Sequence, residues 1–196
     1  SGEQLSISGL GFAPEMVIIK SDTATIPALF KTSSMRDNVM GFFSANADGS
    51  VANINLENVR YTWIAFAGSD CTSSGYFCLG TYSGTGAAQN LTTGFQPDFV
   101  TVKNNEATAA HYKTTSLGAN NHTVFFVNIV KNTTGAYISA LNSDNFSVGT
   151  SDSVAGGTFH YFAFREKANF FKQGTYNGNS TDETVISDVG FAPDFV

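Results

Sequence analysis

Cys71 and Cys78 are the residues of this 196-residue chain whose type and spacing first suggest chemistry. They flank a loop rich in Gly and Ser, and nothing in the sequence supplies the remaining ligands of a zinc site. The favoured interpretation is a disulfide that closes the loop in an oxidising compartment. A pair of free thiols is the alternative.

The three histidines, His111, His122 and His160, fall on different predicted elements. His111 and His160 lie inside strand patterns, so we expect them to pack rather than to catalyse. No Ser lies in the sharp Gly-flanked turn that exposes a nucleophile, and no two carboxylates form a compelling pair. The sequence therefore predicts that the protein is not an enzyme.

Calcium is the one cofactor for which the sequence suggests candidate ligands. The stretch 46–50 resembles part of a calcium loop but lacks the bidentate Glu, so a hairpin turn at Asp48-Gly49 explains it better. Acidic loop residues could still assemble a surface calcium site from oxygen ligands: Asp144, Asp152, Asp182 and Glu183. We expect no other metal and no organic cofactor.

The composition is that of an all-β protein. Only 13% of the residues are charged, and 18 Phe, 7 Tyr and 19 Gly accompany many Ser, Thr and Asn. The net charge is −6 and the basic residues are scattered, which argues against binding to nucleic acid. No run of about 20 apolar residues predicts insertion into a membrane.

A pattern of seven residues, Gly-Phe-x-Pro-acid-apolar-Val, occurs three times, at 11–17, 94–100 and 190–196. The Gly suggests a turn that needs positive φ, and Pro fits the entry to a strand because it lacks an N–H. We call this pattern the turn motif and expect it to mark a step of assembly or repetition. Its defining residues are Gly11, Phe12, Pro14, Val17, Gly94, Phe95, Pro97, Val100, Gly190, Phe191, Pro193 and Val196.

The spacing of the turn motif predicts repeating units of roughly 80 to 100 residues. Each unit holds short strands at intervals of roughly 8 to 12 residues, typical of a sandwich or barrel. We predict two tandem homologous β-sandwich domains of jelly-roll or immunoglobulin-like type. The first spans 1–79 and lacks its opening strand, the second spans 80–168, and 169–196 holds opening strands of a third repeat or a donor segment.

Two interpretations explain the ends of the chain. It is either a window cut from a longer array, or a subunit whose surplus C-terminal strand completes the next subunit by donor-strand pairing. Both make an extended fibre, because a head-to-tail contact that does not close makes an open filament. A monomer with frayed ends is the third interpretation.

The order Gly80-Thr81-Tyr82, then the turn motif at 94–100, then Lys103, resembles an uncharacterised repeat of phage and marine bacterial surface proteins. Members of that group look like tail-fibre, virion-appendage or large secreted repetitive proteins. The resemblance covers both units and implies no catalytic residues. It implies a location outside the cell, on the cell surface or on a virion.

These observations together predict a structural repeat protein of an extracellular or virion filament. Its expected partners are further copies of itself, arranged head to tail. The alternative is a glycan-binding module of a tail fibre or adhesin, in which exposed aromatic rings stack on cell-surface sugars.

Overall fold

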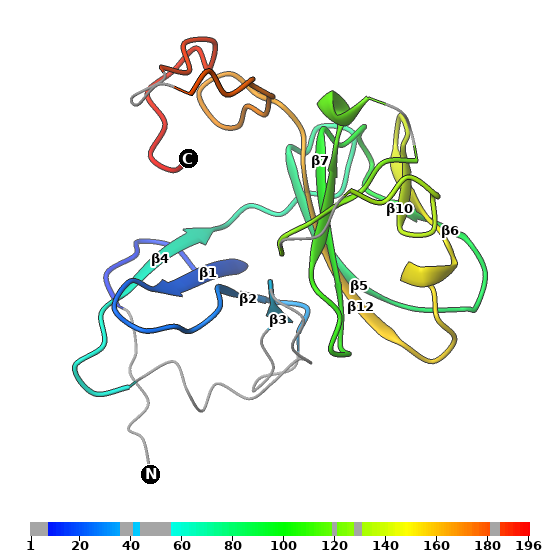
Figure 1. The fold of residues 1–196 in the computed structure, drawn as a ribbon, viewed down its shortest axis with the longest axis horizontal. Coiled ribbons are helices and arrows are strands. Elements are labelled where there is room, and N and C mark those ends of the chain that lie inside the picture. Colours follow the sequence, from blue (N-terminus) through cyan, green and yellow to red (C-terminus); the bar gives the residue numbers. More distant parts are fainter. Residues whose placement is uncertain (1–7, 36–40, 44–55, 119–120, 128–130, 181–184) are drawn as a thin grey trace.

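The computed structural model describes an all-β chain with three antiparallel sheets, as the composition predicts (Figure 1). The described residues are 8–35, 41–43, 56–118, 121–127, 131–180 and 185–196. The strands are β1 Met16–Ser21, β2 Leu29–Thr32, β3 Gly41–Phe42, β4 Tyr61–Phe66, β5 Phe77–Ser83, β6 Gln89–Thr92, β7 Phe99–Asn104, β8 His111–Thr114, β9 Val124–Phe125, β10 Ile138–Leu141, β11 Asn145–Val148 and β12 Thr158–Phe164, with the 3-10 turns η1 Thr115–Leu117 and η2 Thr150–Asp152.

Four strands of the N-terminal half form one sheet in the order β3-β2-β1-β4, which we call the first sheet. Its central strand β1 begins directly after the turn motif, where Pro14 gives way to an apolar run. Met16 lies opposite Thr32 of β2 and Phe66 of β4. The first sheet therefore has β4 at one edge.

The C-terminal half forms a two-layer sandwich. A five-stranded sheet, β5-β12-β7-β8-β9, packs on a three-stranded sheet, β10-β11-β6. The layers meet over a buried apolar cluster of Cys78, Phe95, Val100, Val102, Ile138, Phe146, Val148, Phe159, Tyr161 and Ala163. This arrangement is a β-sandwich, and it occupies most of the predicted second domain.

The two halves share one pairing scheme. Phe99 of β7 lies opposite Thr114 of β8 and Phe164 of β12, just as Met16 lies opposite Thr32 and Phe66. The order β9-β8-β7-β12 thus corresponds strand by strand to β3-β2-β1-β4. The one added strand is β5, which pairs with the outer edge of β12.

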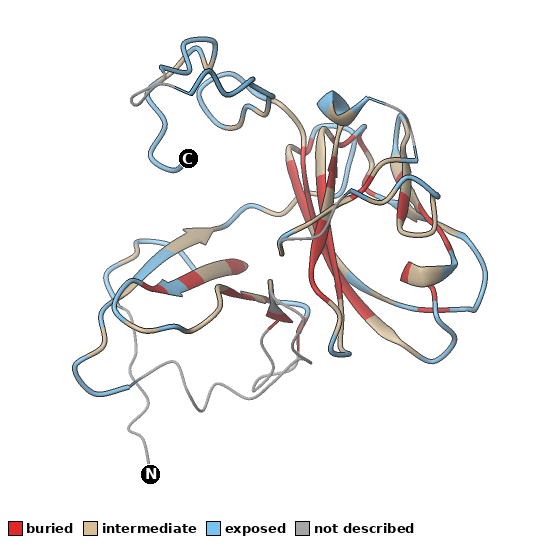
Figure 2. Cartoon of the chain, in the orientation of Figure 1, coloured by how far each residue is buried: buried red, intermediate tan, exposed pale blue. Residues whose placement is uncertain are grey.

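The first sheet lies on the outer face of the five-stranded sheet (Figure 1). A second buried cluster joins them: Met16, Phe30, Met35, Phe77, Phe162 and Phe164. Strand β12 therefore faces apolar layers on both sides, and every residue from Phe159 to Phe164 is buried (Figure 2). A strand covered on both faces needs a continuous run of large side chains rather than an alternating one.

Corresponding residues of the two halves meet at this contact. Phe66 corresponds to Phe164, and their ring centroids lie 5.5 Å apart. Phe43 and Phe126 follow the corresponding strands β3 and β9, and their rings lie 4.7 Å apart. Contacts between like positions are the mark of a two-fold, isologous interface.

Several predicted features concern parts that the structure describes only partly. The first domain is described as a single sheet, and the predicted hairpin at 46–50 lies outside the described residues, so the prediction of two sandwiches stays a prediction. Strand β5 begins at Phe77, so it crosses the predicted boundary between residues 79 and 80. The described parts of 169–196 contain no strand; the only β-type contact there is a bridge between Phe171 and Lys167.

We predict that replacing Phe30 with Ala lowers the free energy of unfolding by about 3–5 kcal/mol. Phe30 is fully buried, and its ring packs 5.5 Å from that of Phe162 across the contact between the sheets. Chemical denaturation followed by circular dichroism measures the change. The matched control is Phe12→Ala, because Phe12 is 47% exposed and should cost far less; equal losses would contradict this packing.

Candidate functional site

The three copies of the turn motif share one backbone conformation. Gly11, Gly94 and Gly190 have φ values of 74°, 77° and 80°. These angles lie in the left-handed region, which residues with a Cβ adopt only at a cost. The sequence prediction of a positive-φ turn agrees with all three positions.

The same motif has different surroundings in its three positions. In the middle copy Phe95 is 2% exposed, and a Cβ on Gly94 would lie 2.5 Å from the Cys71 carbonyl oxygen. At the same position Phe12 of the first copy is 47% exposed and Phe191 of the third copy is half-buried, whereas Phe195, at the position of Phe99, is 63% exposed. The first and third copies therefore present apolar surface, which we call the exposed turn surfaces.

The acidic residue of the motif has a structural role that the sequence pattern did not reveal. Glu15 Oε2 accepts a hydrogen bond from the Ser69 backbone N–H at 2.6 Å. Asp98 Oδ2 likewise accepts one from the Glu166 N–H at 2.8 Å. Each carboxylate thus holds the chain segment that leaves β4 or β12, and this explains why an acid follows Pro.

The disulfide between Cys71 and Cys78 is present in the structure. Its loop lies along the outer edge of β5, where Asp70 N–H donates to the Phe77 carbonyl at 2.8 Å. Leu79 N–H donates to Ser69 Oγ at 3.2 Å. These bonds cover an edge that would otherwise be open to pairing with another chain.

The outer edge of β4 has no such cover among the described residues. Among the described residues, strand β4 pairs with β1 alone, whereas its counterpart β12 lies between β5 and β7. Thr62 is exposed, and Trp63 is 39% exposed. We regard this open edge, together with the exposed turn surfaces, as the candidate functional site for association.

His111 forms a buried polar pair with Asp152. His111 Nε2 lies 2.7 Å from Asp152 Oδ2, and the two side chains are 2% and 3% exposed. His111 Nδ1 lies 3.2 Å from the Ala109 carbonyl oxygen. Both ring nitrogens are thereby satisfied away from solvent, which suits a structural role.

Other polar groups also serve the packing of the two halves. Thr81 Oγ1 lies 2.9 Å from His160 Nδ1 and 3.0 Å from Ser34 Oγ, so this group of side chains bridges the five-stranded sheet to the first sheet.

Burial raises the pKa of the Tyr82 and Tyr161 hydroxyls. It also lowers the pKa of Lys113, which donates to the His122 carbonyl at 2.8 Å.

Two of the four predicted calcium ligands, Asp144 and Asp152, lie in the part of the chain that the structure describes. Asp152 pairs with His111, and the carbonyl of Asp144 accepts bonds from the N–H groups of Thr93 and Gly94. Asp182 and Glu183 lie outside the described residues. No three His, Cys, Asp or Glu side chains gather to hold a metal among those described.

Helices long and apolar enough to cross a membrane are absent from the described residues.

We predict that replacing both Cys71 and Cys78 with Ser lowers the free energy of unfolding by about 2–3 kcal/mol, since the bond closes a short loop. Denaturation with urea measures this loss. Adding a reductant to the wild-type protein should reproduce it, and should leave the double variant unchanged. A reductant that has no effect on the wild-type protein would contradict the bond.

We predict that Asp152→Ala costs about 3–5 kcal/mol, because it leaves the buried His111 without its partner. The position that corresponds to His111 in the first sheet is Leu29. His111→Leu combined with Asp152→Ala should therefore cost clearly less than the sum of the two single changes. Strictly additive losses would mean that the two side chains do not interact.

The comparisons with known proteins concern the second half of the chain. A family described as a domain of unknown function (DUF7483) matches residues 72–161. The match runs from the disulfide loop into β12 and includes none of the first sheet. No curated protein and no solved structure matches the chain. Over less than half of its length, the chain is thus similar to a domain family whose function is unknown.

Proposed function

We propose that the protein is a structural repeat protein of an extracellular or virion filament, assembled through tandem repeats or strand complementation between copies. The observation that carries this proposal is the shared scheme of the two halves. The strand order β3-β2-β1-β4 recurs as β9-β8-β7-β12, and the corresponding faces pack on each other. A chain built from one repeated scaffold suits a protein whose task is to extend and connect.

Exposed apolar side chains support association with further copies. Phe12, Tyr176 and Phe195 are 47%, 68% and 63% exposed, and all three lie in or beside copies of the repeated motifs. Apolar side chains that cluster at a surface commonly mark contacts with other proteins. A contact between the first and third turn motifs would join unlike surfaces, which produces a head-to-tail chain.

The disulfide supports a location outside the cell. Cys71 and Cys78 are bonded, and such bonds persist in oxidising surroundings. The bond covers the edge of β5 and lies beside the buried turn at Gly94. Its loss in a reducing compartment would loosen the part of the chain that links the two halves.

A glycan-binding role is the second candidate, and Trp63 favours it. This Trp is 39% exposed on the open strand β4, and an exposed aromatic face can stack on a sugar ring. Binding to an array of glycans that is lost in Trp63→Ala would support this role. Absence of binding across a broad array would count against it.

We predict that the intact protein forms extended particles, seen by electron microscopy, whose mass in light scattering rises with concentration. Charges at the exposed turn surfaces, in Phe12→Asp with Phe195→Asp, should reduce this association because they make apolar contacts unfavourable. Val154→Asp is the matched control, since Val154 is 56% exposed but lies outside the motifs. Compact monomers of the wild-type protein at every concentration would refute the filament.

A further inference from the structure

The contact between the two halves is nearly two-fold symmetric, so contacts from one half to the other should occur in matched pairs. Phe66 meets its counterpart Phe164, and Phe43 meets its counterpart Phe126. Within each half the same ring pairs recur, with Phe30 and Phe43 at 5.2 Å and Tyr112 and Phe126 at 4.9 Å. In an isologous arrangement, each contact from one half to the other has a counterpart in the reverse direction.

After β4 the chain crosses to the other half. It leaves the first sheet at Phe66 and then forms β5 on the outer edge of β12. Phe77, the first residue of β5, lies between the halves, with its ring 6.0 Å from that of Phe66 and 4.8 Å from that of Phe164. The strand that completes the five-stranded sheet is therefore supplied across the contact.

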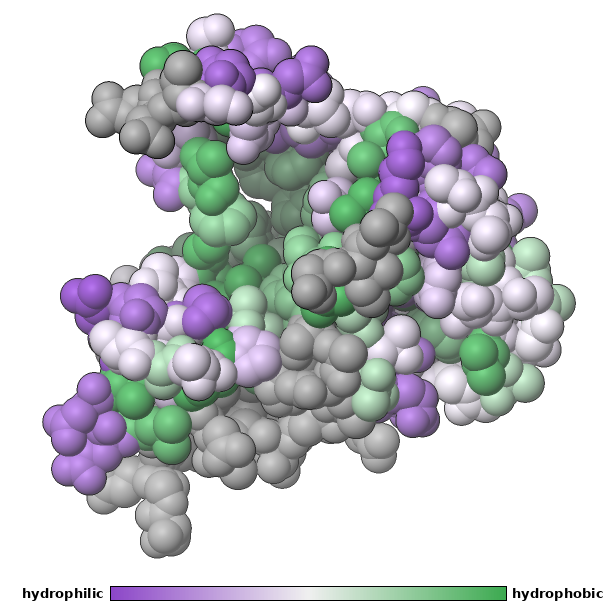
Figure 3. All heavy atoms as spheres, viewed as in Figure 1, coloured by the Kyte–Doolittle hydropathy of each residue, from purple (hydrophilic) through white to green (hydrophobic). Residues whose placement is uncertain are grey.

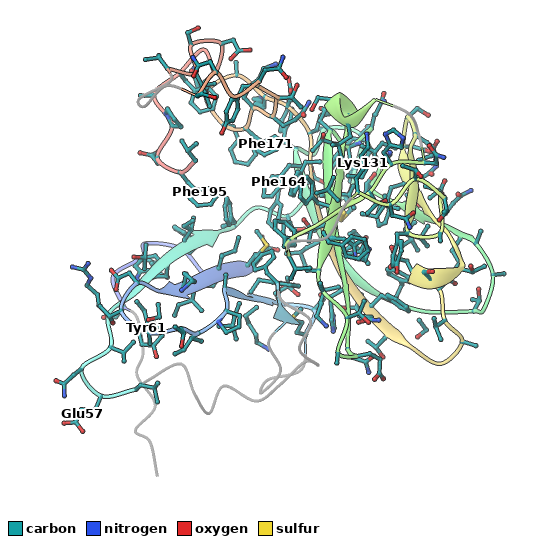
Figure 4. All side chains as sticks on the ribbon, viewed as in Figure 1. Glu57, Tyr61, Lys131, Phe164, Phe171 and Phe195 are labelled. Carbon is teal, nitrogen blue, oxygen red and sulfur yellow. A yellow bond between two sulfur atoms is a disulfide. The ribbon has the colours of Figure 1, made fainter. Side chains whose placement is uncertain are left out.

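After β12 the chain begins the reverse crossing. Phe171 stacks on Phe164 with ring centroids 5.0 Å apart (Figure 4). Phe171 therefore packs on Phe164, at the end of β12, in the way that Phe77 packs on Phe66, at the end of β4. Gln173 lies beside Ser116, with Ser116 Oγ 2.5 Å from its Oε1. Ser116 corresponds to Ser34, whose hydroxyl contacts Thr81 of β5 in the other half.

The sequence that follows β12 matches that of β5. Residues 171–178 share Phe, Gly, Thr, Tyr and Gly with residues 77–84, in the same order and at the same spacing. Residues 174–176 are exposed and belong to no strand, although they repeat the Gly-Thr-Tyr of β5. The chain therefore holds a second strand-forming segment of the β5 type.

We propose that residues 171–176 dock on the open edge of β4 in the same molecule, antiparallel, as a counterpart of β5. The register follows from the pairing of β5 with β12. It places Phe171 opposite Phe66, Thr175 opposite Thr62 and Tyr176 opposite Tyr61. Docking gives the first sheet a fifth strand, so that β4 is paired at both edges as β12 is.

The glycine in this segment supports the register. In β5 a Cβ on Gly80 would lie 2.8 Å from the ring of Tyr161, so the ring packs across a residue without a side chain. Trp63 is the residue of β4 that corresponds to Tyr161, and its ring is partly exposed. Gly174 has nothing within 4 Å of an added Cβ in the undocked arrangement. The register brings Gly174 beneath the ring of Trp63.

The path to β4 is short and lightly held. Figure 3 shows a recess between the C-terminal segment and the first sheet, with hydrophobic residues along its floor. Phe171 stays packed on Phe164, and the rest of the segment is held aside by Lys172, which lies 2.6 Å from Glu166, and by the bonds of Gln173 to Thr115 and Ser116. These are surface contacts of polar groups, which are individually weak in water. Docking replaces them with a ladder of main-chain hydrogen bonds.

The inference does not depend on the filament, because it concerns how one molecule completes its own sheet. The variant Thr62→Cys with Thr175→Cys tests it, since the equivalent pair in the sandwich, His160 and Thr81, is in side-chain contact. Mild oxidation should give an intramolecular bond. On a non-reducing gel most of the protein would then run as a compact monomer, at any concentration, with the linked peptides identified by mass spectrometry.

The matched control is Thr62→Cys with Asn179→Cys, which displaces one cysteine by about 13 Å along the strand and should form little of this product. Equal linking in both variants, or none in either, overturns the inference. Concentration-dependent dimers and ladders also overturn it, and would instead support strand exchange between copies. The two proposals can fail separately. Filaments without the intramolecular bond would refute only the docking, and the bond without filaments would refute only the filament.

Trp63 gives a second measurement in the native protein, because it is the single Trp of the chain. Docking covers its ring, so its fluorescence should lie at shorter wavelength and be quenched less by acrylamide than in Gly174→Val. The side chain of Val would collide with the ring in the docked register, whereas it is tolerated in the undocked one. Asn179→Val is the control and should match the wild-type protein. Identical quenching in Gly174→Val and wild type overturns the docking.

Discussion

The structure depends on a layer of aromatic side chains between two β-sheets. Phe30, Phe66, Phe162 and Phe164 come from both halves and interlock at centroid distances of about 5 to 6 Å, within the range of favourable edge and offset contacts. Because this layer lies on the outer face of the sandwich, the five-stranded sheet has two cores rather than one. Strand β12 contributes side chains to both cores, and its neighbours β5 and β7 contribute to the same two cores.

Because both faces of the five-stranded sheet are covered, some polar side chains of the sandwich half are buried. His111, Asp152 and Lys103 are buried in the sandwich half, and such groups are tolerated when their hydrogen bonds are met internally. His111 and Asp152 meet this need together, and Lys103 donates to the Glu106 carbonyl at 2.7 Å. The ordinary apolar residue Leu29 at the position of His111 shows that the scaffold does not require the pair.

Local features were predictable from the sequence, and long-range ones were not. The glycines at 11, 94 and 190 have the positive φ that their turn suggested, and the apolar run after Pro14 is the strand β1. Strand β12 is covered on both faces by the two buried clusters, and a sequence pattern does not say which segments cover a strand. The role of Glu15 and Asp98 was also hidden, because their partners, Ser69 and Glu166, are distant in sequence.

The disulfide limits how far the two halves of the chain can be pulled apart. The two halves meet mainly through side chains, so a pull along the chain would part them at the aromatic layer before it sheared a sheet. The chain between Phe66 and Phe77 would then lengthen as a tether. Because Cys71 and Cys78 are bonded, the residues between them cannot extend, and force passes through sulfur directly into β5. The bond thus sets how far the halves can separate while the sandwich stays folded.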